Sequence, residues 1–451
     1  MSRNYHNLAL SALILFLTTG NSAAASELSV QDTGTKYQHS VHGKNREKII
    51  LIEGLSEDEW IIRAIWLEEN GAFERSREVY GKLYAATGKK EYLFKEVSSS
   101  IYGNTHISES LKKLKAWSDK HEDDLVGRRL LLALYMNLKS FDEAAKIANY
   151  LLKHSDKDSD LELAANPYLF SGNYKKGVEL LNKLYRKTKD ENVLMRIAAI
   201  EAQYLNDPKK AIQLLETHRR MQDSSTNVYK MLIDLYVKEQ NIDHILQTYK
   251  ALYEKEPKEE YLGKIIEIYV YNRDFDSLIS FLESNHANDE ILYDLYKKEK
   301  RYKKAIKLSE KFYLEDNNPH WLAEKAILTY EAADNKDDPK MLESVASLFD
   351  QALALGVDDS IYLNYYGYTL IDKGLDIDKG LGLIRKALKQ QPDNSYYLDS
   401  LAWGYYKKGE CLKAYTTMEK VVAKEGTEEP EIKEHWEKIQ ECQKPVIVGS
   451  R

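Results

Sequence analysis

Cysteine, proline and glycine are all scarce in this chain. Its 451 residues include only 2 cysteines, 8 prolines and 21 glycines. Two cysteines exclude a disulfide scaffold and a thiolate metal site, and the shortage of proline and glycine is untypical of proteins built from many short strands. After residue 25 no run of 18 apolar residues occurs, so we expect no membrane-spanning helix there. The composition favours a soluble, helical protein.

A surplus of positive charge is missing as well. The net charge is −7 at pH 7 and 30% of the residues are charged. Lysine pairs such as Lys303–Lys304 alternate with acids, as on solvated helix faces, so we expect no nucleic-acid partner. The sequence contains no phosphate-binding G-x-x-x-x-G-K-[ST], no H-E-x-x-H and no G-x-S-x-G. We therefore predict no enzyme activity, no small-molecule substrate and no cofactor.

Two short patterns imitate metal sites without completing them. His39 and His42 form an H-x-x-H pair, but the surrounding polar sequence supplies no further ligands. The aspartates of D-K-D-S-D at 156–160 begin like a calcium-binding loop, yet Leu161 and Pro167 stand where that loop needs Gly and a bidentate Glu. We interpret these aspartates as solvent-facing residues of a turn and a helix N-terminus, and we predict no metal site.

The first 25 residues differ from the rest of the chain. Arg3 precedes an apolar run at 8–17, and small residues at 22–25 form a cleavage site. We predict a signal peptide that is cut after Ala25, with an uncleaved anchor as the alternative. No cysteine lies near the cut, which argues against a lipoprotein. The expected location is periplasmic or otherwise exported.

A helical period begins at Ser56, after a polar linker at 26–55. Ser56 and Glu59 form a capping-box pattern before the apolar-periodic stretch W-I-I-R-A-I-W-L. Corresponding positions then recur 34 residues apart, with small residues at one position and bulky residues at others. The spacing relates Trp60, Phe94 and Arg128; Ser76, Ser110 and Ala144; Tyr80, Leu114 and Ala148; and Leu83, Trp117 and Leu151.

A second series of residues follows the turns and opens the second helix of each unit. Its members are Phe73, Phe141, Tyr174, Ile242, Phe275, Tyr302, Ile377 and Cys411. Together the two series predict a helix-turn-helix unit of about 34 residues that repeats roughly eleven times. The unit near 276–300 is shorter than the others, and the unit near 319–357 carries an extra polar turn.

The clearest units, at 226–257, 360–393 and 395–425, resemble the tetratricopeptide repeat family. The resemblance rests on Tyr229, Leu232, Ile233, Tyr236, Tyr249, Leu252, Pro257, Leu363, Gly367, Leu370, Gly380, Ile384, Ala387, Pro392, Leu398, Ala402, Tyr405, Ala414 and Met418. It implies an all-α solenoid over 56–425 that forms a right-handed superhelix, followed by a capping helix and tail at 426–451. It also implies that a protein or peptide partner binds a concave surface lined by the first helix of each repeat.

The last two repeats are similar to exported tetratricopeptide adaptor proteins of Gram-negative bacteria, some of which recruit substrates to carboxyl-terminal processing proteases. The matching stretches are Y-G-Y-T-L at 366–370, L-I-R-K-A-L at 383–388, Y-L-D-S-L-A-W at 397–403 and P-E-I at 430–432. They imply a scaffold or adaptor in envelope protein processing or assembly, peripherally associated with the envelope. The alternatives are a structural component of a secretion or polysaccharide-export apparatus, or an enzyme with an unrecognised site.

Helical spacing divides the first helices of these two repeats into two stripes. The packing stripes are Leu363, Tyr366, Gly367 and Leu370, and Leu398, Leu401, Ala402 and Tyr405. The second stripes supply our candidate partner-binding residues: Asn364, Tyr368, Ile371, Asp399, Trp403 and Tyr406. For Tyr368 and Trp403 two interpretations stand: they cover a neighbouring helix or the C-terminal helix, or they form a partly exposed aromatic groove. Upstream, this face carries charges at Lys230, Asp234 and Glu267.

Cys411 and Cys442 are the only thiols of the chain. Cys411 stands where earlier units place an aromatic residue, so we interpret it first as a small buried core residue. A disulfide with Cys442 is the alternative, because an exported chain folds in an oxidising compartment.

Overall fold

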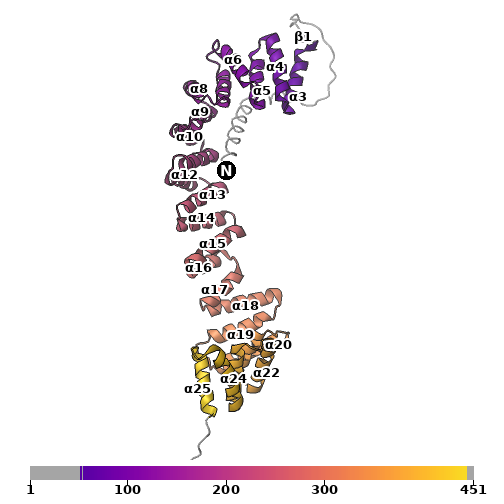
Figure 1. Cartoon of the computed structure of the whole chain (residues 1–451), viewed down its shortest axis with the longest axis vertical. Coiled ribbons are helices and arrows are strands. Elements are labelled where there is room, and N and C mark those ends of the chain that lie inside the picture. Colours follow the sequence, from indigo (N-terminus) through magenta and orange to yellow (C-terminus); the bar gives the residue numbers. More distant parts are fainter. Residues whose placement is uncertain (1–50, 53, 444–451) are drawn as a thin grey trace, which may run out of the picture. The chain divides into compact units, whose positions relative to one another are not determined.

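The computed structural model describes residues 51, 52 and 54–443. Over this part the chain forms consecutive helices, preceded by a short antiparallel ribbon of β1 (Leu51–Ile52) and β2 (Leu55–Ser56) (Figure 1). The predicted signal peptide and its cut after Ala25 lie outside the described residues, as does the H-x-x-H pair. None of the described helices is long and apolar enough to cross a membrane.

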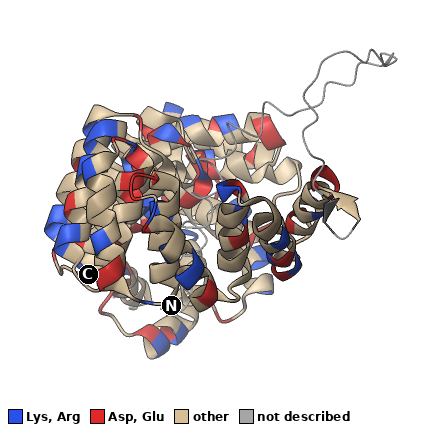
Figure 2. Ribbon diagram, turned by 90° about the horizontal axis from the view of Figure 1, so that it is seen from above, with Lys and Arg blue, Asp and Glu red and all other residues tan. Residues whose placement is uncertain are grey.

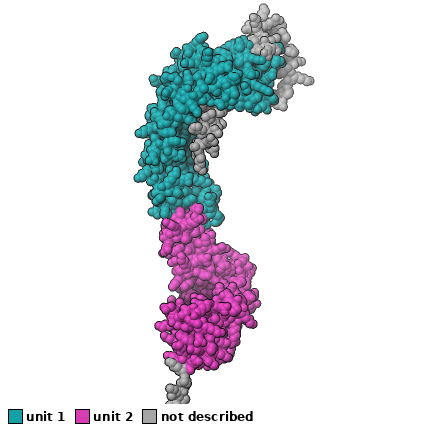
Figure 3. Space-filling model, in the orientation of Figure 1, with its two compact units in different colours: residues 1–262 teal, residues 263–451 magenta. Residues whose placement is uncertain are grey.

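The chain divides into two compact units, residues 1–262 and 263–451, and the boundary falls inside helix α15 (Figure 3). The helices up to this boundary are α3 (Glu57–Glu69), α4 (Phe73–Thr87), α5 (Lys90–Gly103), α6 (Ile107–Ser118), α7 (Leu125–Asn137), α8 (Phe141–His154), α9 (Asp158–Phe170), α10 (Tyr174–Thr188), α11 (Glu191–Gln203), α12 (Pro208–Met221), α13 (Thr226–Lys238), α14 (Ile242–Lys255) and α15 (Glu259–Asn272). The second unit continues with α16 (Phe275–Asn285), α17 (Asp289–Lys298), α18 (Tyr302–Asp316), α19 (His320–Ala332), α20 (Pro339–Ala354), α21 (Ser360–Asp372), α22 (Ile377–Gln390), α23 (Ser395–Lys407), α24 (Cys411–Glu425) and α25 (Pro430–Gln443).

The described helices form eleven successive helix-turn-helix pairs, from α3 and α4 to α23 and α24, and α25 follows them. The predicted tetratricopeptide-like α-solenoid with a C-terminal capping helix is therefore confirmed. Every residue that we expected to open a second helix is the first residue of one, from Phe73 in α4 to Cys411 in α24. The predicted capping box is also present, since the backbone N–H of Glu59 donates to the Ser56 hydroxyl and the Ser56 N–H donates to the Glu59 carboxylate.

The 34-residue period is the period of the core. Ser76, Ser110 and Ala144 are all buried, and their small side chains let two helices cross closely. Leu83 and Leu151, two bulky residues from another 34-residue series, are fully buried. Each helix pair thus covers the apolar face that the neighbouring pair cannot bury alone.

One predicted surface residue lies in the core. We expected Asp160 to face solvent, but its side chain is buried in the first turn of α9, where both carboxylate oxygens accept from the Arg129 guanidinium at 2.7 Å. A buried carboxylate requires such pairing, because desolvation otherwise makes its charge costly. Burial would raise the pKa of Asp160, but the hydrogen bonds from Arg129 and Ser155 outweigh it and hold that pKa below its ordinary value.

In the second unit, α21 and α22 approach one another through glycine. A Cβ atom on Gly380 would lie 2.6 Å from the carbonyl oxygen of Gly367, closer than real side chains come to backbone. Only glycine fits this crossing. Helix α21 also contacts α23, the first helix of the next repeat.

Candidate functional site

The six candidate residues lie on α21 and α23, two neighbouring first helices that contact each other. Asn394 caps α23 by accepting from the N–H groups of Tyr396 and Tyr397, and Asp359 caps α21 by accepting from that of Ile361. These caps fix where each helix begins and thus which side chains share its second stripe. The structure brings Tyr368, Ile371, Trp403 and Tyr406 into one cluster.

The second stripes are largely buried. Ile371 is fully buried and packs closely against the backbone of α22 and α23, at Gly380 and Gly404. It is a core residue in this structure, because both glycines leave room for its side chain. The buried Oδ1 of Asn364 has no hydrogen-bond partner among the described residues. We therefore define the aromatic site as Tyr368, Asp399, Trp403 and Tyr406.

Trp403 is the centre of the aromatic site and is only 4% exposed. Its ring stacks on Tyr406 at 4.8 Å and on His435 of α25 at 4.0 Å between ring centroids. The indole N–H donates to Asp372 at 3.2 Å. Of the two interpretations left open by the sequence, the structure shows the one in which Trp403 packs against the C-terminal helix.

Asp399 is a second buried member of the aromatic site. Both of its carboxylate oxygens lie 3.0 Å from Nδ1 of His435, and both side chains are almost inaccessible to solvent. The ring of His435 therefore contacts the face of Trp403, the carboxylate of Asp399 and, at 6.1 Å between ring centroids, the ring of Tyr368. Sequence reasoning missed His435 entirely.

Tyr368 completes the contact with α25. Its hydroxyl donates to the carboxylate of Glu431 at 2.5 Å. Burial and this carboxylate together raise the pKa of Tyr368. On the same helix the ammonium group of Lys438 lies 5.3 Å from the centre of the Trp403 ring.

Glu431, His435 and Lys438 share one face of α25, and we call them the α25 polar stripe. Their spacing of i, i+4 and i+7 is the signal that could have identified them in the sequence. Ile432 and Ile439 lie next to His435 on the buried side of α25 and pack into a core with α23 and α24. The aromatic site is thus covered by α25, the last helix that the structure describes.

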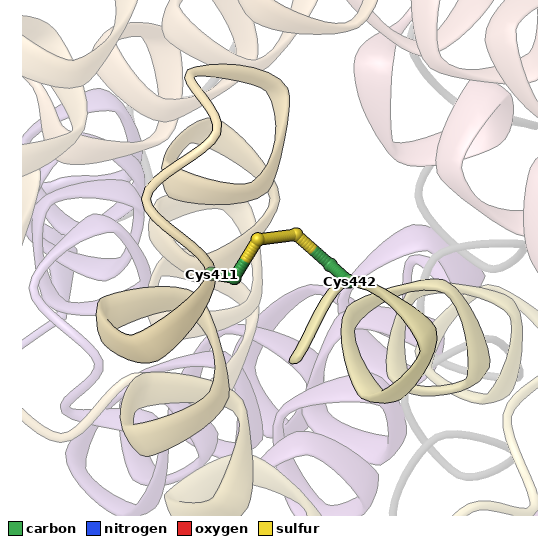
Figure 4. The surroundings of a disulfide bond; sticks show 2 residues. All are labelled: Cys411 and Cys442. Atoms are coloured by element: carbon green, nitrogen blue, oxygen red, sulfur yellow. A yellow bond between two sulfur atoms is a disulfide. The ribbon is translucent and has the colours of Figure 1, made fainter. Parts of the chain in front are cut away.

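A disulfide fastens α25 at its far end. Cys411, the first residue of α24, is bonded to Cys442 near the end of α25, with 5.6 Å between the Cα atoms (Figure 4). The expectation of a free, buried Cys411 is wrong, because α25 folds back and brings Cys442 to the start of α24. Both cysteines are half-buried rather than buried.

First helices outside the aromatic site carry charged residues of both signs, and Figure 2 shows acidic and basic residues interspersed along the helices. Some of these helices also expose apolar side chains, such as Trp66 on α3. Lys230 and Asp234 on α13 are exposed, as the sequence predicted. In the second unit, Glu324 on α19 accepts from Tyr293, Lys297 and Tyr362 on the neighbouring first helices. Among the described residues, no group of three or more His, Cys, Asp or Glu side chains could hold a metal ion.

No family model and no curated protein matches this sequence. Among solved structures, the chain is similar to one of Naa15/Naa10 bound to HypK-THB, with 16% identity and a TM-score of 0.35 over 85% of this chain and 62% of that chain. It is also similar to a chain of the APC/C hetero-tetramer Cut9-Hcn1, with 10% identity and a TM-score of 0.33 over 86% of this chain and 97% of that one. The chain is similar as well to the P58(IPK) TPR domain, with 13% identity and a TM-score of 0.21 over 87% of this chain and 99% of that one. The fold assignment rests on the helix pairs themselves.

Proposed function

We propose that this protein is an exported scaffold or adaptor whose first-helix surfaces bind a protein or peptide partner. The observation that carries the proposal is where apolar and charged side chains lie on the helices. Most of the large apolar side chains are buried in packing between helices, whereas first helices such as α13 keep charged side chains on the surface. A row of such helices offers an extended surface to which a polypeptide can bind, and its charged side chains make the binding specific.

The disulfide supports the exported location. Bonds such as Cys411–Cys442 persist in oxidising compartments and are reduced in the cytosol. The signal-peptide pattern in residues 1–25 supports the same location. These features favour a periplasmic protein, and the likeness of its last two repeats to exported adaptors favours a role in envelope protein processing or assembly, in peripheral contact with the envelope.

Site-specific photo-cross-linking in intact cells tests the proposal. One cross-linkable residue replaces Asp234, exposed on the first helix α13, and another replaces Gln247, exposed on the second helix α14 of the same pair. We expect a discrete cross-linked protein from the Asp234 position in the periplasmic fraction and none from the Gln247 position. Cross-links that form only at Gln247, or a chain that stays in the cytosolic fraction, would contradict the proposal.

A further inference from the structure

Helix α25 contacts the repeats through apolar side chains and through the adjoining polar stripe. Ile432 and Ile439 bury apolar surface against α23 and α24, as a capping helix must. The α25 polar stripe instead contacts the aromatic site through a hydrogen bond, a buried His–Asp pair and ring stacking. Polar and aromatic contacts of this kind are typical of an interface that a partner can also form, since they are specific and do not depend on a large apolar area.

The aromatic site requires an occupant. Without α25, Asp399 would lose His435, the only side chain that hydrogen-bonds to it among the described residues, and the face of Trp403 would be left to solvent. The three side chains that satisfy the site come from one helix at a spacing of i, i+4 and i+7. Any amphipathic helix that presents an acid, a histidine and a lysine or arginine at this spacing offers the same contacts.

The disulfide determines whether α25 can leave the site. It closes the helix onto α24 at one end, while the chain connection at 426–429 holds the other end. A helix tethered at both ends rebinds faster than a free partner can enter, because its effective concentration is very high. With the disulfide open, one tether remains and an external helix can compete.

We propose that α25 is an internal ligand of a helix-binding site on α21 and α23, and that the Cys411–Cys442 disulfide locks it there. Reduction by a dithiol breaks the S–S bond: the two sulfurs take up two electrons and two protons, and the dithiol becomes a disulfide. The released site then binds an amphipathic helix with the chemistry of the α25 polar stripe. This inference rests on the proposed partner-binding function. It names the class of ligand as an amphipathic helix and the regulator of binding as the disulfide.

The test uses the full-length exported chain and a fluorescent peptide with the sequence of residues 430–443, in which Cys442→Ser prevents cross-linking. Because the chain has only two cysteines, dithiothreitol acts on this disulfide alone. We expect the peptide to bind the reduced chain at least about tenfold more tightly than the oxidised chain, measured by fluorescence anisotropy. Equal affinity in both states overturns the proposal, and so does the absence of binding to both.

Two controls keep the result interpretable. The His435→Ala peptide is expected to lose at least about tenfold in affinity, because Asp399 then stays unpaired, whereas the Lys433→Ala peptide, changed at an exposed position, keeps its affinity. Equal affinity of the two peptides would contradict the role of the polar stripe. A Cys442→Ser chain, checked by circular dichroism for folding, must bind like the reduced chain.

Hydrogen exchange gives a measurement that does not depend on the peptide. Amides of residues 430–443 are expected to exchange faster after reduction, while those of α13 do not change. Unchanged protection of 430–443 overturns the lock. Failure of either experiment leaves the cross-linking test at Asp234 intact, so the lock and the partner-binding function can fail separately.

Discussion

The imidazole of His435 lies 4.0 Å from the indole of Trp403, with 16° between the two ring planes. The same imidazole hydrogen-bonds to Asp399, so one side chain of the last helix joins an aromatic and an acidic residue of the last repeat. These three residues connect the stability of the C-terminal end to the binding site that we propose there.

Trp403→Ala is expected to destabilise the protein by about 3–5 kcal/mol, because it empties a large buried volume and removes the stacking partner of His435. Tyr396→Ala is the matched control on the same helix, since Tyr396 is 72% exposed, and should change the stability by less than about 0.5 kcal/mol. Urea unfolding followed by circular dichroism measures both. Equal midpoints for the two variants would show that Trp403 is not part of the core.

A double-mutant cycle at Asp399 and His435 should show strong coupling. His435→Ala alone leaves a buried carboxylate unpaired and is expected to cost about 3–5 kcal/mol. Removing Asp399 as well should cost less than the sum of the single changes, with a coupling energy of about 1–3 kcal/mol. Lys433→Ala, at an exposed position of α25, serves as the control. Additive single effects would contradict the pairing.

Glu324 makes the second unit sensitive to acid. Burial would raise its pKa, but hydrogen bonds from Lys297, Tyr293 and Tyr362 outweigh burial and hold the pKa below its ordinary value of 4.5. A carboxylate whose pKa is depressed by folding contributes stability above its unfolded pKa, and this contribution is lost as the pH falls through the folded pKa.

The stability of the second unit should therefore decrease as the pH falls below 4.5, and Glu324→Gln should remove part of this decrease. Urea midpoints measured from pH 7 down to about pH 3 test this expectation. Glu343→Gln, at an exposed position of α20, is the control and should leave the pH profile unchanged. An identical profile for Glu324→Gln and the unchanged chain would show that the network contributes nothing.

Two glycines of α22 should respond in opposite ways to alanine. Gly380→Ala is expected to destabilise by about 1–3 kcal/mol, because its Cβ would meet the Gly367 carbonyl at 2.6 Å and Ile371 at 2.7 Å. Gly382→Ala has no atom within 4 Å of its Cβ and should stabilise by about 0.4–1 kcal/mol. Thermal unfolding measures the pair, and a shift in the same direction for both would contradict the close crossing of α21 and α22.

Periodicity alone determined the repeat architecture of this protein. A 34-residue spacing of small and bulky residues predicts stacked helix pairs, and most of those positions are buried in the structure. The turn sequences predicted the first residue of eight second helices. Helical spacing placed Lys230 and Asp234 on the same face of α13, where both are exposed.

Only the tertiary structure decided what covers each face. Helical spacing places Asp399, Trp403 and Tyr406 on one stripe, but it does not say which segment packs there, since that depends on how the chain folds back after Glu425. The same applies to Asp160, whose partner Arg129 comes from another repeat, and to Cys411, which meets Cys442 only once α25 is in place. Contacts between residues distant in sequence are set by packing, so the sequence left alternatives open that only the folded chain resolves.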